Sequence, residues 1–218
     1  MLTNIAVSFE FLSALFALIF VGKYKKSALL FFLFLLCYTA FNEIIGIWYA
    51  DSNIAGNNYI LFNIRDFLYL SFLFWMYQKN MISRNRQRLV QLFLVVYLLI
   101  SIINATYSNF ITDGQVLASI TGGVFLIISI MLYFIELLYT KDIVKIKQDL
   151  LVYISLGNLI FYVGYIPIDV MIQLSFRSVR ITDFDSFYFI LNYIQAALVI
   201  LMNLIFIIGF LWAEKRSN

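Results

Sequence analysis

The 218-residue chain contains no histidine, a single cysteine (Cys37) and a single proline, and only 12% of its residues are charged. The lack of histidine excludes HExxH zinc proteases, Ser–His hydrolases and haem held by histidine. One cysteine excludes an intrachain disulfide and a cysteine-based metal cluster. The sequence also has no Walker A or GxGxxG phosphate-binding motif. Enzymatic activity is therefore not expected, and no cofactor or metal is predicted.

The scarcity of charge indicates where the chain resides. Soluble globular domains carry roughly 25% charged and about 45–50% apolar residues, whereas hydrophobic residues make up 63% of this chain. So much apolar surface requires lipid around it. The sequence therefore predicts one all-α transmembrane domain over residues 1–218, with the lipid bilayer as its first partner.

Seven apolar runs are long enough to cross a bilayer, which takes about 20 residues each. Because backbone polar groups that face lipid must be bonded within the segment, all seven are expected to be helices. The fourth run has the shortest apolar part. The predicted spans cover residues 5–22, 27–49, 59–78, 89–107, 115–138, 149–173 and 186–212.

Basic residues are concentrated on alternate connections. Twelve of the 15 Lys and Arg residues follow the first, third, fifth and seventh spans. Basic residues favour the cytoplasmic side, so this bias predicts an N-terminus outside and a cytoplasmic C-terminus. The basic connections are interpreted either as topology signals that also attract anionic lipid or as docking sites for a cytoplasmic partner. The candidates for docking are Arg84, Arg86, Arg88, Lys145 and Lys147. Nucleic-acid binding is not expected at a net charge of +3.

Ionisable residues inside the predicted spans gather at one depth. A charge at a helix centre costs about 2.5–3.5 kcal/mol on insertion scales, so these side chains should face the bundle interior. Four of them, Glu10, Glu43, Arg65 and Asp66, lie five to seven residues in from the outer ends of their spans, and Asp169 lies close to an outer end. Arg65 and Asp66 are neighbours that point about 100° apart on a helix, so they need not pair with each other.

The amides and tyrosines extend this pattern. One face of span 149–173 carries Asn158, Tyr162, Tyr165 and Asp169 at helical spacing, and Asn192 lies at similar depth in the last span. Two interpretations remain open. In one, Arg65 bridges Glu43 or Glu10 in a purely interhelical network. In the other, the same residues line an outward-facing pocket for a small ligand or cation, since carboxylates outnumber arginine there. The candidate ligand-binding residues are Glu10, Glu43, Arg65, Asp66, Asn158, Tyr162, Tyr165, Asp169 and Asn192.

Three stretches resemble a bacterial family of small multi-spanning membrane proteins without an established activity: residues 62–68 (FNIRDFL), residues 153–164 (YISLG followed by FYVG), and residues 190–210 (ILNY followed by NLIFIIGF). This chain departs from the family in having Asp66 where glutamate is usual, Ser155 where asparagine is usual, and no histidine near Asn192. The resemblance implies a bundle of about seven helices in the bacterial cytoplasmic membrane. Genes for such proteins are often found near signalling genes, so the resemblance also implies a sensing or accessory role.

Three functions follow as hypotheses. The first is a non-enzymatic sensor or accessory protein that detects a small ligand, cation or membrane state through the polar cluster. The second is a small transporter or channel-forming subunit, which needs a polar path through the whole bilayer and is disfavoured by a dry inner half. The third is a scaffold or effector that engages a cytoplasmic partner through its basic loops, with a homo-oligomer as one form of it.

Overall fold

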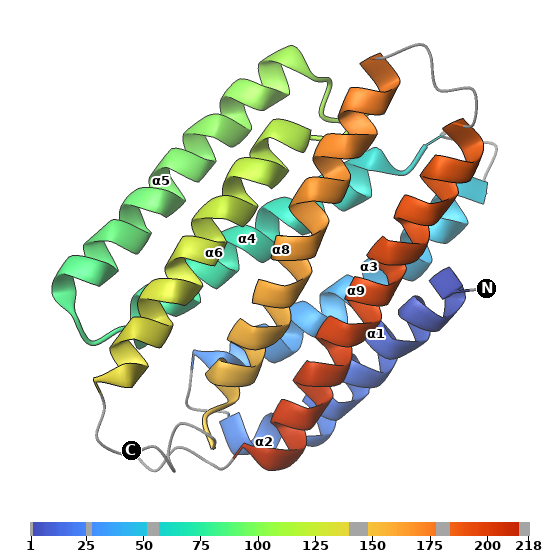
Figure 1. Ribbon diagram of the computed structural model, residues 1–218. Helices are drawn as coiled ribbons and strands as arrows, with labels where there is room; N and C mark the ends of the chain where they lie inside the picture. The colour runs from blue at the N-terminus through green and yellow to red at the C-terminus, as the bar shows by residue number, and fades with distance from the viewer. Residues whose placement is uncertain (1, 25–27, 52–56, 140–147, 178–183, 214–218) are drawn as a thin grey trace.

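A computed structural model describes residues 2–24, 28–51, 57–139, 148–177 and 184–213, and all regular elements in these ranges are helices (Figure 1). Seven helices of 18 residues or more are joined by short connections, and a four-residue helix follows the first of them. The helices are α1 (Leu2–Ile19), α2 (Val21–Tyr24), α3 (Leu29–Asp51), α4 (Tyr59–Asn80), α5 (Arg84–Tyr107), α6 (Val116–Leu138), α8 (Leu150–Arg177) and α9 (Phe184–Trp212).

Six of the described helices are long and apolar enough to cross a membrane: α1, α3, α5, α6, α8 and α9. This confirms the prediction of an all-helical, multi-pass membrane bundle. The remaining long helix, α4, spans 22 residues but carries Arg65, Asp66 and Lys79 along with several polar side chains. With these residues, α4 is not among the helices that length and composition alone identify as membrane spans.

The largest shift from the predicted boundaries is in α5, which begins at Arg84 rather than at residue 89. The prediction that Arg84, Arg86 and Arg88 lie in a loop was therefore wrong, because all three belong to the first turns of this helix. The predicted span starts at Leu89, where the apolar run begins. Arginine and glutamine are good helix formers, so the helix continues beyond the apolar run.

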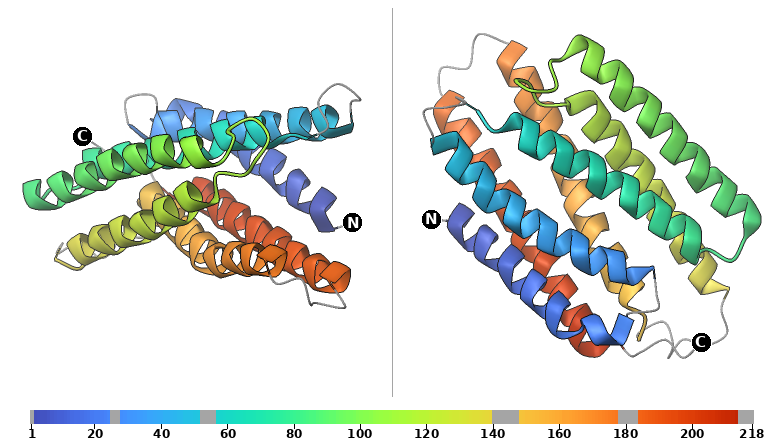
Figure 2. Two further views of the ribbon diagram at one scale, coloured as in Figure 1. Left: turned by 90° about the horizontal axis from the view of Figure 1, so that it is seen from above. Right: turned by 180° about the vertical axis from the view of Figure 1, so that it is seen from behind.

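The long helices form two layers (Figure 2). One layer consists of α3, α4 and α5, and the other of α6, α8 and α9, with neighbouring helices in contact within each layer. The layers join at one edge where α6 contacts α4 and α5, and α1 closes the other edge by contacting α3 and α9. The space between α4 and α8 is thus surrounded by helices.

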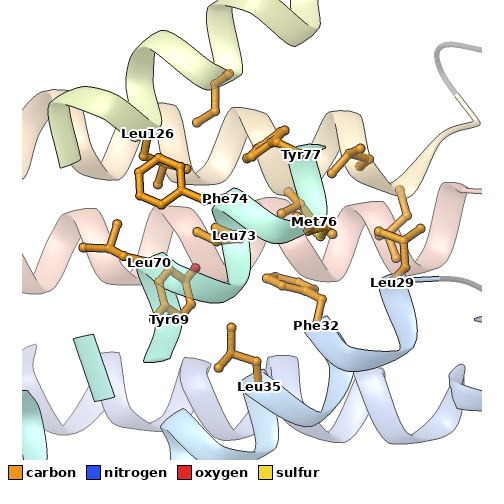
Figure 3. Packing of buried hydrophobic residues seen from close by; sticks show 14 of the residues in the cluster. Leu29, Phe32, Leu35, Tyr69, Leu70, Leu73, Phe74, Met76, Tyr77 and Leu126 are labelled. Carbon is orange, nitrogen blue, oxygen red and sulfur yellow. The ribbon is translucent and has the colours of Figure 1, made fainter. Parts of the chain in front are cut away.

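Apolar side chains fill the half of this interior that lies toward the α4–α5 connection (Figure 3). Phe32 of α3 meets Phe206 of α9 edge to face, with ring centroids 5.3 Å apart. Leu73, Met76 and Tyr77 of α4 are fully buried beside them. We refer to this half as the inner half, and the described part of its interior is packed mainly with apolar side chains.

Glycines allow α8 and α9 to approach closely. A Cβ atom added at Gly157 would lie 2.6 Å from the ring of Phe206, and one at Gly164 would lie 2.6 Å from Leu198. On α9, a Cβ at Gly209 would lie 2.5 Å from that of Tyr153. Small residues at helix contacts are the usual means of bringing helices together in membranes.

Replacing Gly157 by alanine should destabilise the bundle by about 1–3 kcal/mol, as overpacking of a filled interface does. The added methyl would also lie 3.1 Å from the backbone oxygen of Met202, which cannot move aside as a side chain can. Gly22→Ala is the matched control, since nothing lies within 4 Å of a Cβ there. Thermal unfolding of detergent-purified protein, followed by tryptophan fluorescence, measures both; equal melting temperatures would contradict the proposed packing.

Candidate functional site

Arg65 is the centre of the polar cluster. Its Nη1 lies 3.0 Å from Oε2 of Glu43, and its Nε lies 3.0 Å from Oδ1 of Asp66. The guanidinium also stacks over the ring of Phe62, with Cζ 4.6 Å from the ring centroid. The predicted Arg65–Glu43 bridge between helices is therefore present. Arg65 also pairs with Asp66, although adjacent helix positions do not require it, because the long arginine side chain turns back to its neighbour.

Asp66 of α4 is a cluster residue on the helix face that points into the bundle. It lies on the face of α4 that also carries the buried residues Asn63, Leu70 and Leu73, so this face points into the bundle. Its carboxylate interacts electrostatically with Asp169 of α8. The side chain of Asp66 nevertheless keeps 40% of its surface accessible. The carboxylate of Asp66 is therefore only partly covered by its neighbours.

Glu10 approaches the cluster from α1. Because α1 begins at Leu2 rather than at residue 5, Glu10 lies near the middle of its helix and deeper than the sequence suggested. It interacts electrostatically with Glu43 and Arg65. Its Oε2 is buried and has no hydrogen-bond partner among the described residues. A buried carboxylate oxygen without a donor is costly, and a second carboxylate nearby adds to that cost.

The aromatic residues of α8 complete the cluster. Tyr162 is buried, and its ring lies where a Cβ at Gly123 of α6 would meet it. Tyr165 stacks on Phe161 with ring centroids 5.2 Å apart. Asn158 on the same face accepts a hydrogen bond from Tyr69 of α4, so the predicted face of span 149–173 does point toward α4.

Tyr69 also belongs to the site, although it is one of 15 tyrosines and is not among the residues predicted for the cluster. Its hydroxyl donates a 2.8 Å hydrogen bond to Oδ1 of Asn158, and both side chains are buried. It also interacts electrostatically with Glu10, Arg65 and Asp66. The spacing was the available signal, since a residue four after Arg65 and three after Asp66 shares their side of the helix.

A second hydrogen bond joins α4 and α8 nearer the inner half. The hydroxyl groups of Tyr77 and Ser155 lie 2.8 Å apart and are both buried. On α9, Asn203 accepts a 2.6 Å hydrogen bond from Ser13 of α1. Asn192 is half-buried on α9, and none of the described contacts joins it to the other predicted cluster residues.

At the inner end, Glu136 of α6 fixes the connection between α4 and α5. Its Oε1 accepts hydrogen bonds from the backbone N–H groups of Ile82 and Ser83 at 2.7 and 2.8 Å. Its Oε2 lies 3.8 Å from Nη1 of Arg86. Among the residues proposed for partner docking, Arg86 therefore has an internal role, while Arg84 and Arg88 are exposed. The other two, Lys145 and Lys147, lie outside the described residues.

A further group of contacts closes the inner end around α2. The hydroxyl of Tyr133 donates to Oδ2 of Asp149 at 3.2 Å, and Lys23 donates to the backbone oxygen of Ala213. Burial raises the pKa of Tyr24 to about 12, and the nearby Asp149 carboxylate adds to this rise. Tyr24 therefore stays neutral at physiological pH. These contacts tie α2, α6, α8 and the end of α9 together.

Comparison with protein-family models, with curated proteins and with solved structures finds no match. The resemblance of the three motifs to a bacterial membrane family is therefore still an expectation. Among the described residues, no group of three or more His, Cys, Asp or Glu side chains is arranged to hold a metal ion.

Replacing Arg65 by glutamine should destabilise the protein by about 3–5 kcal/mol, because the change leaves partly buried carboxylates without their cation. The double variant R65Q/E43Q should recover part of this loss, since it removes one of those carboxylates. Lys79→Gln is the control, because Lys79 is an exposed cation at the end of the same helix. Thermal unfolding of the four proteins in detergent gives the comparison; R65Q melting like K79Q would show that the pairs contribute little.

Proposed function

We propose that this chain is a non-enzymatic sensor or accessory protein of the bacterial cytoplasmic membrane. In this proposal the cluster around Arg65 responds to a small ligand and alters the action of a protein partner. The observation that carries it is the accessible carboxylate of Asp66 on the interior face of α4. A residue needed only for helix pairing would be covered by its partners. Asp66 instead pairs with Arg65 and still offers open surface.

The packing of the inner half supports sensing over transport. A transporter or channel needs a polar path from one side of the membrane to the other. Below the cluster, Phe32, Leu73 and Phe206 are fully buried and meet across the interior. The polar contacts at that depth, such as the one between Tyr77 and Ser155, are already satisfied by each other. Among the described residues, apolar packing therefore separates the cluster from the inner end of the bundle.

Helix α8 provides a route by which the cluster could act at a distance. Pro167 lies within it, between Tyr165 and Asp169 of the cluster. Proline has no N–H group, so it removes one helical hydrogen bond and favours bending at that point. A ligand that changes the spacing of Asp66 and Asp169 would shift the outer part of α8 relative to α4. The Tyr69–Asn158 hydrogen bond then couples this movement to the inner half.

The proposed topology has seven crossings, with the N-terminus outside and the C-terminus in the cytoplasm. The seventh crossing is α4, whose 22 residues span about 33 Å, enough for a hydrocarbon core of about 30 Å. Apolar residues form its outward surface, where Ile64 is 38% and Leu68 43% exposed. Arg65 and Asp66 have partners inside the bundle, as charged residues in a spanning helix require.

Tags at the two ends of the chain should lie on opposite sides of the membrane. In intact spheroplasts, an N-terminal epitope should be digested by added protease, and a C-terminal epitope should be digested only after the membrane is permeabilised. Six crossings would place both tags on one side. Protection of both tags, or digestion of both, would therefore exclude α4 as a spanning helix.

Sensing predicts that the cluster is needed for function but not for insertion. In a strain that lacks the gene, complementation by Asp66→Asn or Glu43→Gln should fail to restore the wild-type transcript profile, although both proteins reach the membrane at normal levels. Glu214→Gln, which removes one negative charge from the C-terminal tail of the sequence, should restore it. Full restoration by both cluster variants would contradict the proposed function.

A further inference from the structure

We propose that the outward face of α5 binds a phospholipid with an anionic headgroup, whose phosphate lies against Arg84 and Arg88 at the inner end of the bundle. In this arrangement the acyl chains follow the apolar part of the same helix face. The inference goes beyond the proposed sensing function and does not depend on it. It comes from the rotation of α5, from two exposed arginines and from the apolar surface that continues from them.

Contacts with α6 fix the rotation of α5 about its own axis. Phe93 stacks on Phe125 of α6, with ring centroids 4.9 Å apart and the ring planes inclined by 6°. Further along the helix, Oδ1 of Asn104 accepts a 2.9 Å hydrogen bond from the backbone N–H of Ala118. The buried residues of α5 recur at every seventh position and so lie on one side of the helix: Val90, Tyr97 and Asn104. The opposite side of α5 faces outward.

The three arginines at the start of α5 divide between these two sides. Arg86 lies on the inward side, where its Nη1 is 3.8 Å from Oε2 of Glu136. Arg84 and Arg88 are exposed on the outward side, without an ion-pair partner among the described residues. Because they are four residues apart, they are neighbours on the helix surface. Two adjacent guanidinium groups attract a phosphate and can bond it through paired N–H donors.

The same side of α5 continues as an apolar surface. Four residues follow Arg88 on it at intervals of three or four positions, and each keeps between 47% and 64% of its surface exposed: Leu92, Val95, Leu99 and Ile102. At 1.5 Å per residue, Leu99 lies about 16 Å beyond Arg88. One leaflet of the hydrocarbon core is about 15 Å thick. A lipid whose phosphate lies at the arginines therefore has its acyl chains beside these residues throughout its leaflet.

The combination of charge and apolar surface favours a lipid over other occupants. Two copies that packed through this face about a twofold axis normal to the membrane would bring their Arg84 and Arg88 side chains together, and like charges repel. A soluble partner would contact the arginines alone, because the apolar surface extends from them into the membrane. An anionic lipid compensates both cations with its headgroup and covers the apolar surface with its chains.

Native mass spectrometry of the full-length protein in detergent measures the binding of single lipids. Dioleoylphosphatidylglycerol should bind more tightly than dioleoylphosphatidylcholine, which has no net charge. Removing one cation should weaken phosphatidylglycerol binding about fivefold in Arg84→Gln and in Arg88→Gln, and the double variant should bind the two lipids alike. Lys79→Gln is the matched control, because it removes an exposed cation near the same end of the bundle but from α4. It should bind both lipids as the wild type does.

Equal binding of the two lipids by the wild-type protein would overturn the inference. Equal losses in Lys79→Gln and Arg88→Gln would do so too, since binding would then depend on net charge and not on this face of α5. Displacement of phosphatidylglycerol by inorganic phosphate at equal ionic strength would show that the arginines bind a free anion instead of a lipid. Both arginines are exposed, so their variants should melt like the wild type; if one does not, the other still tests the same site.

Discussion

The guanidinium of Arg65 lies inside a bundle whose outer surface is apolar, and the positions of its neighbours follow from that fact. A cation at this depth must be compensated, so Glu43 of α3 and Asp66 of α4 are both drawn to it at 3.0 Å. The first contact holds α3 against α4. The second fixes the carboxylate of Asp66 beside the guanidinium on the same helix. One partly buried charge thereby joins two helices through its ion pairs.

The inner half obeys a different constraint. There the helices are held by close packing, with Phe32 against Phe206 and with glycine at the contact of α8 with α9. Lipid offers no hydrophobic drive for helices to associate, so close fit and buried hydrogen bonds must hold them together. The Tyr69–Asn158 bond lies where the two halves meet and connects the same two helices as Asp66 and Asp169. The two halves of the bundle are thus held by different interactions, ion pairs and hydrogen bonds in one and close apolar packing in the other.

Features that depend on composition along the chain could be predicted from the sequence. Apolar runs predicted the long helices. The shared depth of the charged residues predicted that Arg65 bridges Glu43 or Glu10, and the bridge to Glu43 is present. Other features depend on side-chain reach or on tertiary neighbours. The start of α5 at Arg84 reflects helix propensity beyond the apolar run. The Arg65–Asp66 pair needs a folded-back arginine, and Tyr69 becomes part of the site only because Asn158 lies opposite it.

The two interpretations of the polar residues, an interhelical network and a ligand site, are not alternatives for the same atoms. Arg65, Glu43 and Asp66 form a network that accounts for the Nε and Nη1 atoms of the guanidinium and one oxygen of each carboxylate. Glu10 and Asp169 lie beside this network without ion-pair partners among the described residues. A network selected only to hold helices together would gain stability by losing those two charges.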